Sequence, residues 1–181
     1  MKTIAIILSL MLSPLAFSQD DFDLQNLEYL QVKGREGEST HVRCFGDDVM
    51  VGMRHKNSGD ESIVGMWCDS APFLISGKDR FIEVNNFSGR DYDVKCHNDE
   101  FMSGVNFSND LDDSIEGIYC RKLIFHTLQS EFYVSFYEGY SLESLHDEFC
   151  PEGSVVSGVR FHKSHWDDTT SGFFCNFVDS F

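Results

Sequence analysis

Two kinds of residue in this 181-residue chain could bind a ligand or take part in chemistry. One is a set of six cysteines, and the other is a set of acidic pairs that each precede a serine or threonine. Two carboxyls at a defined separation can act as acid and base on a glycoside, and several carboxylate oxygens together can bind Ca²⁺. The acidic pairs are Asp60-Glu61, Asp112-Asp113 and Asp167-Asp168.

The cysteines mark three similar units, about 44–68, 96–120 and 150–175. In each unit a glycine follows the first cysteine by eight positions, and a second glycine precedes the second cysteine by three. An acidic pair and two bulky apolar residues also recur in the same register, which indicates an internal repeat of roughly 53 residues. The glycines are Gly52, Gly104 and Gly158, and then Gly65, Gly117 and Gly172.

An even number of cysteines in a secreted chain indicates disulfides rather than free thiols. Six cysteines allow 15 connectivities, and the repeat selects pairing within each unit. Each bridge would close a loop of about 25 residues, worth roughly 3 kcal/mol in the chain-entropy model. The predicted disulfides are Cys44–Cys68, Cys96–Cys120 and Cys150–Cys175.

The pattern of apolar residues predicts an all-β chain. Loose alternation over Val49–His55, Phe101–Phe107 and Val155–Phe161 predicts three strands, each with its glycine at a bulge or a close backbone approach. Further strand patterns lie between the units, separated by turn signals such as Ser76–Asp79. Helical spacing is not apparent in any window of a dozen residues.

Three copies of a β unit predict one domain, 19–181, with pseudo-threefold symmetry. The tail after Cys175 is too short for a full inter-repeat stretch, and Gln19–Arg43 could supply the rest, so we expect the two ends of the chain to meet. A β-prism and a β-trefoil both fit this pattern. The strand-rich stretches between the repeats favour the prism.

The beginning of the chain predicts secretion. Lys2, the apolar run Ile4–Leu15 and the small residues of Ala16-Phe17-Ser18 form a signal-peptide pattern over 1–18. With 14 basic and 30 acidic residues, the formal net charge is −16, which argues against nucleic acid and anionic membranes as partners. No later stretch approaches the roughly 20 apolar residues of a membrane span, so we expect no membrane insertion.

The third repeat, CPEGSVVSGVRF followed by DDTTSGFFC, resembles the vitelline membrane outer layer protein I family. In that family a Cys-Pro-x-Gly start and an Asp-Asp-Thr-x-x-Gly-Φ-x-Cys end recur in threes. The first two repeats depart from this start, with Phe45-Gly46 and His97-Asn98 after their cysteines. The resemblance covers about Cys44–Cys175 and implies a prism of three Greek-key sheets. It also implies a secreted structural component of an egg-coat-type layer, with a surface for chito-oligosaccharides.

We therefore expect a secreted structural protein whose partners are extracellular glycans or coat proteins; its oligomeric state is left open. A lectin-like module and a weak chito-oligosaccharide transglycosylase are the alternatives. We expect the acidic pairs to be turn and cap residues, with an acidic rim for Ca²⁺ or sugar hydroxyls as the functional alternative. Three near-identical pairs argue against catalysis, because a glycosidase needs carboxyls in unlike environments. In a eukaryotic source, Asn86 and Asn106 would be glycosylation sites.

Overall fold

The computed structural model describes residues 27–32, 39–57, 62–71, 73, 75–84, 92–108, 114–136, 144–163 and 168–179. Within these ranges the chain forms twelve strands and no helix, which confirms the all-β prediction. The strands are β1 (Glu28–Gln31), β2 (Ser39–Arg43), β3 (Asp48–Asn57), β4 (Ser62–Ser70), β5 (Ile75–Glu83), β6 (Tyr92–Lys95), β7 (Glu100–Ser108), β8 (Ser114–Leu123), β9 (Leu128–Ser135), β10 (Ser144–Phe149), β11 (Ser154–Lys163) and β12 (Asp168–Val178).

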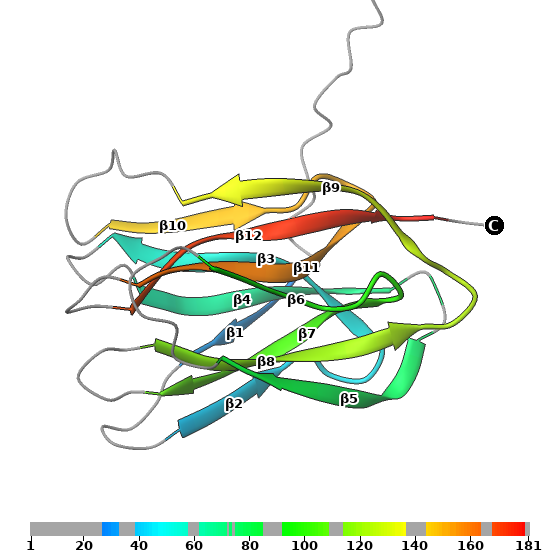
Figure 1. The fold of residues 1–181 in the computed structure, drawn as a ribbon, viewed down its shortest axis with the longest axis horizontal. Coiled ribbons are helices and arrows are strands. Elements are labelled where there is room, and N and C mark those ends of the chain that lie inside the picture. The colour runs from blue at the N-terminus through cyan, green and yellow to red at the C-terminus, as the bar shows by residue number, and fades with distance from the viewer. Residues whose placement is uncertain are drawn as a thin grey trace, which may run out of the picture.

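The strands form three antiparallel four-stranded sheets, as expected for a β-prism. Sheet A has the order β1-β4-β3-β10, sheet B the order β2-β7-β8-β5 and sheet C the order β6-β11-β12-β9. The two central strands of each sheet are the hairpin of one repeat, and the strands run roughly along the long axis of the molecule (Figure 1). The prism, rather than the trefoil, is therefore the architecture.

The edge strands link the three sheets in a cycle. β1, β5 and β9 each pair with the second strand of the next hairpin along the chain. β2, β6 and β10 instead cross to another sheet, where they pair with β7, β11 and β3. The stretches after the first and second repeats supply β5–β6 and β9–β10. β1 and β2, which lie before the first repeat, occupy the corresponding positions for the third stretch. The prediction that residues before the first cysteine complete the third inter-repeat stretch is thus confirmed.

The inner faces of the three sheets meet in one apolar core. Each sheet contributes side chains with no exposed surface, and five of the six cysteines are buried among them. A second apolar cluster lies around the first residues of β3 and β11 and the end of β8. Fully buried members of the central core include Met50, Met53, Met66, Met102, Val105, Ile118, Val156, Val159 and Phe173.

The first glycine of each repeat lies at a bulge, as predicted. The pairing register within every hairpin shifts immediately before this glycine. A Cβ on Gly104 would lie 2.2 Å from the carbonyl oxygen of Val42, and one on Gly158 would lie 2.6 Å from that of Val94. Only glycine lets the crossing edge strand approach the hairpin this closely.

The turn predicted at Ser76–Asp79 is wrong, because these residues lie inside β5. Ile75 pairs with Leu123 and Asp79 pairs with Arg121, so the pairing register is irregular between them. The extra residues are accommodated as a bulge of the edge strand, where Gly77 and Lys78 are exposed. Turn-forming residues therefore bend this strand without ending it.

Candidate functional site

The predicted acidic site lies almost wholly outside the described residues. Asp168 is the first residue of β12, and its side chain is outside the described part. The strand ends that flank the acidic pairs all lie at one end of the prism, on the left in Figure 1. The acidic rim and its Ca²⁺ stay predictions. The other acidic residues, all outside the described ranges, are Asp60, Glu61, Asp112, Asp113 and Asp167.

All six cysteines form disulfides, and the predicted pairing within each repeat is confirmed. Each bridge joins the segment just before a hairpin to the second strand of that hairpin. The Cα–Cα distances are 5.8, 5.6 and 5.7 Å, within the usual range for a disulfide. The bridges are Cys44–Cys68, Cys96–Cys120 and Cys150–Cys175.

The outer face of sheet A carries an arginine between a carboxylate and two aromatic rings. Arg54 of β3 donates two hydrogen bonds of 2.6 Å to Asp147 of β10. Its guanidinium carbon lies 4.5 Å from the ring centre of Tyr29 and 5.1 Å from that of Trp67. Trp67 Nε1 also donates to Asp147, at 2.8 Å. This arrangement ties together all four strands of the sheet.

Sheet C repeats the arrangement at equivalent positions. Arg160 of β11 donates to both carboxylate oxygens of Asp93 in β6, at 2.6 and 3.0 Å. Its guanidinium carbon lies 4.5 Å from the ring centre of Tyr133 and 5.1 Å from that of Phe174. The hydrogen bonds from Arg160 hold the pKa of Asp93 below its usual value, against the opposing effect of burial.

Sheet B departs from this pattern, with Asn106 in place of the arginine and His41 in place of the aspartate. Asn106 Nδ2 donates to Glu116 Oε2 at 3.0 Å, and Ser39 Oγ donates to the same oxygen at 2.7 Å. The Tyr119 hydroxyl lies within hydrogen-bond distance of His41 Nδ1, at 2.6 Å. The three outer faces are thus not equivalent.

An aromatic pair lies beside these polar groups. Phe81 of β5 is 44% exposed, and its ring centre lies 5.0 Å from that of Tyr119. The guanidinium carbon of Arg43 lies 5.0 Å from the Tyr119 ring centre. We call the group the sheet B cluster. Its members are His41, Arg43, Phe81, Asn106, Glu116 and Tyr119.

A half-buried ion network adjoins the sheet B cluster. Asp79 accepts hydrogen bonds from Arg121 Nε at 2.7 Å and from Ser103 Oγ at 2.8 Å, and it pairs with Arg43 at 3.2 Å. Burial alone would raise the pKa of Asp79, but these hydrogen bonds and the two positive charges hold it below its usual value. His41, Arg43, Asp79 and Arg121 line one hollow of about 370 Å³. Polar groups therefore converge on a concave surface at this sheet.

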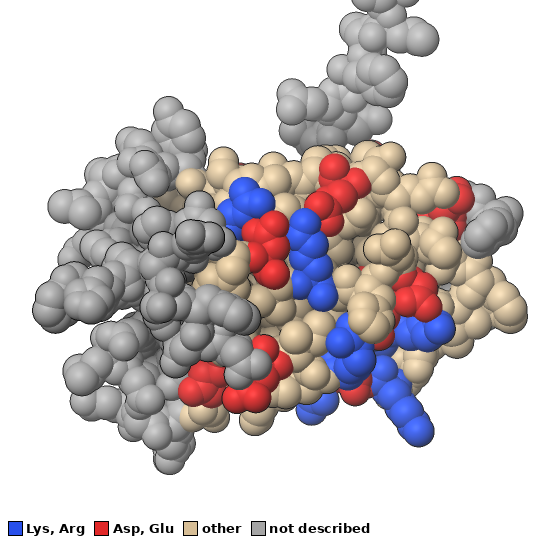
Figure 2. Space-filling view, in the orientation of Figure 1, with Lys and Arg blue, Asp and Glu red and all other residues tan. Residues whose placement is uncertain are grey.

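Acidic and basic side chains are interleaved on the visible face of the molecule (Figure 2). Among the described residues no three His, Cys, Asp or Glu side chains are grouped so that they could hold a metal ion. Nor does the described part contain a helix long and apolar enough to cross a membrane.

The two predicted glycosylation sites differ in what the structure describes. Asn86 lies outside the described residues. Asn106 is 7% exposed, and its Nδ2 donates to Glu116. The nitrogen that would carry a glycan is therefore engaged in the folded chain.

Sequence reasoning missed the sheet B cluster, although one signal was available. In the first and third repeats the central glycine is followed two positions later by Arg54 or Arg160, whereas the second repeat has Asn106 there. His41 and Phe81 come from edge strands, whose pairing partners the sequence does not reveal. In comparisons with known proteins, no family model, curated protein or solved structure matches the chain.

Proposed function

We propose that this chain is a secreted structural protein of an extracellular, egg-coat-type layer, similar to vitelline membrane outer layer protein I. The observation that carries the proposal is the set of three disulfides, each closing the same hairpin in one three-sheet prism. Disulfides at equivalent positions of a small all-β protein are typical of proteins that must persist outside the cell. The exchange of edge strands also supports the proposal. Each sheet contains one edge strand that crosses over from another repeat, so the three repeats form one interlinked structure.

The proposal is tested by expressing the full chain in a secreting eukaryotic host that deposits an extracellular matrix. We expect the protein outside the cells, with its leader removed at Gln19, without free thiols and enriched in the insoluble extracellular fraction. A Cys96→Ser, Cys120→Ser variant should be secreted less well, because each bridge contributes about 3 kcal/mol. Retention of the unaltered chain inside the cell with reduced cysteines would contradict secretion. Recovery only as a freely soluble protein would contradict the coat role.

Oligosaccharide binding at the sheet B cluster is the second candidate function. Sugars present apolar ring faces and hydroxyl groups. The cluster offers the exposed Phe81 ring, which packs on Tyr119, and it also contains the imidazole of His41 and the carboxylate of Glu116. The Glu116 carboxylate, which accepts hydrogen bonds from Ser39 and Asn106, carries no ion pair among the described residues. The equivalent positions of sheets A and C are filled by closed arginine–aspartate pairs.

Calorimetric titration with chito-oligosaccharides tests this second function. Saturable binding should weaken roughly tenfold or more in Phe81→Ala, as for truncation of an anchoring aromatic residue. Phe177→Ala is the matched control, because Phe177 is an exposed ring of sheet C at 41% exposure. The variant Asp112→Asn, Asp113→Asn tests whether the oligosaccharide binds to the acidic loops instead. Loss in that variant alone would move the site to the loops, and no heat with any oligosaccharide would remove this function.

A further inference from the structure

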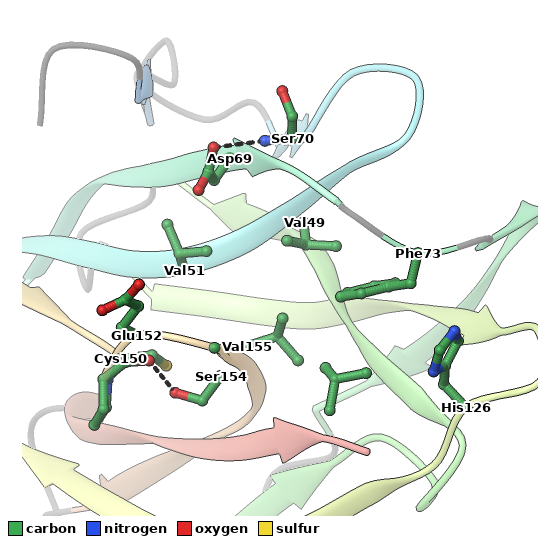
Figure 3. Close-up of a pocket in the computed structure, with 13 residues that line it drawn as sticks. Val49, Val51, Asp69, Ser70, Phe73, His126, Cys150, Glu152, Ser154 and Val155 are labelled. Carbon is green, nitrogen blue, oxygen red and sulfur yellow. Dashed lines mark hydrogen bonds between the residues drawn. The ribbon is translucent and has the colours of Figure 1, made fainter. Parts of the chain in front are cut away.

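A pocket of about 520 Å³ lies at the strand ends opposite the β3–β4 and β11–β12 hairpin ends, and Figure 3 shows its lining. Its walls come from six parts of the chain that meet at this end: the start of β3, the end of β4, the segment between β4 and β5, the segment between β8 and β9, the turn into β11 and the end of β12. Val49, Val51 and Val155 line it and are themselves almost fully buried. These valines belong to the second apolar cluster of the fold, together with Phe101 and Leu123. The volume is in the range of small-molecule sites.

The walls are fixed by hydrogen bonds rather than by loose side chains. Ser154 N donates to the Pro151 carbonyl at 3.1 Å, which closes the turn that carries Glu152. Asp69 Oδ1 accepts from the Ser70 amide at 2.7 Å. On the other side, His126 Nδ1 lies 2.7 Å from the Asp179 carbonyl oxygen. The pocket is therefore preformed on these sides.

The pocket has a polar side and an apolar side. Figure 3 shows the carboxylates of Asp69 and Glu152 toward the left with Val51 between them, the rings of Phe73 and His126 on the right, and Val49 and Val155 in the middle. Neither carboxylate has an ion-pair partner among the described residues. The thirteen lining residues include no lysine or arginine. An anionic ligand would meet two like charges here, whereas a cation would meet two opposite ones.

We propose that this pocket binds a cationic amphiphile, that is, an aliphatic chain carrying an ammonium head group. The head group lies between Asp69 and Glu152. The chain extends over the valines toward Phe73, where it replaces water on an apolar surface. This binding site does not depend on the proposed structural function.

The test is calorimetric titration of the oxidised mature protein with decyltrimethylammonium chloride below its micelle concentration. We expect saturable binding of one molecule per chain. Sodium decanoate, which has the opposite charge on a similar chain, should bind at least tenfold more weakly. Tetramethylammonium, which has the head group without the chain, should not bind measurably. Equal binding of decanoate, or no saturable binding of the decyl cation, would overturn the proposal.

Variants separate the pocket from general attraction to an acidic protein. Asp69→Asn with Glu152→Gln should weaken binding roughly five- to tenfold, as expected for two partly exposed ion pairs. Glu83→Gln with Glu131→Gln removes the same charge from exposed residues that do not line the pocket, and it should leave binding unchanged. Phe73→Ala should weaken binding of the decyl cation through lost chain contact. An equal loss in the control pair, or none in Asp69→Asn with Glu152→Gln, would contradict the assignment; melting curves establish that each variant is folded.

Discussion

Replacement of His55 by phenylalanine should stabilise the protein and remove much of its sensitivity to mild acid. His55 of β3 is 2% exposed, and its Nε2 has no hydrogen-bond partner among the described residues. Its ring stacks on Phe136 at 4.2 Å between ring centres. At the equivalent positions of the other two repeats the core holds Phe107 and Phe161. The first repeat thus places a polar ring where the fold otherwise uses an apolar one.

The magnitude follows from the two states of the imidazole. An unsatisfied buried nitrogen destabilises the folded state by about 1–3 kcal/mol. At neutral pH, replacement by phenylalanine removes this penalty. In the folded protein, burial and the nearby charge of His146 lower the pKa of His55 from 6.5 to about 4. The unfolded chain takes up the proton first, so stability is complete above pH 6.5 and falls as the pH drops toward 4. At about 1.36 kcal/mol per pKa unit, the loss is about 3 kcal/mol.

The assay is guanidinium unfolding of the wild-type chain and of His55→Phe at several pH values between 7 and about 4. The variant should be more stable at pH 7, and the difference should grow as the pH falls. Asp147 and Glu148 lie near His55 on the paired strand β10, but the wild-type and variant chains share them, so the comparison isolates the histidine. Phe161→His is the reciprocal control and should introduce an acid-sensitive site into the third repeat. Parallel stability curves for the two chains over this pH range would refute the reasoning.

The remaining predictions concern the ion network and the glycines. Asp79→Asn should lower the free energy of unfolding by roughly 3 kcal/mol, because it leaves the buried Arg121 without its carboxylate; Asp99→Asn, which breaks an exposed pair, should leave the melting temperature unchanged. The lowered pKa of Asp79 means that its contribution is present at neutral pH and is lost as the pH falls below about 4. Gly117→Ala should cost roughly 1–3 kcal/mol, since its Cβ would lie 2.2 Å from a phenylalanine ring, whereas Gly77→Ala meets nothing within 4 Å and should be nearly neutral. Guanidinium midpoints measure these effects, and equal losses in a variant and its control would contradict them.

The repeat made much of the fold predictable from sequence. The near-equal cysteine spacing of the three repeats selected the correct disulfides, and the recurring central glycine marked the bulge in every hairpin. Each disulfide and each bulge involves residues of a single repeat, so the pattern within that repeat is enough to predict it. The need for Gln19–Arg43 to complete the third inter-repeat stretch followed from counting, and β1 and β2 now fill that place.

The exchange of edge strands was not predictable by the same means. β2, β6 and β10 precede their own hairpins in sequence but pair with another one. The alternation of apolar and polar residues indicates which face of a strand is buried, but it does not indicate which other strand pairs with it. The sheet B cluster and the end pocket depend on these pairings, because each draws residues from segments far apart in the chain. The acidic pairs are the main candidates for ligand binding in the sequence, but they lie almost wholly outside the described residues. Their role therefore stays a prediction.

Three disulfides at equivalent positions should supply much of the stability of this prism. The most direct measurement is guanidinium unfolding of the oxidised chain with and without reductant, alongside a sample with a metal chelator. Three bridges at roughly 3 kcal/mol each are comparable with the whole stability of a typical domain, about 5–15 kcal/mol. We predict that reduction lowers the unfolding midpoint sharply and that the chelator has no effect. A midpoint that is unmoved by reductant but falls with chelator would contradict the account.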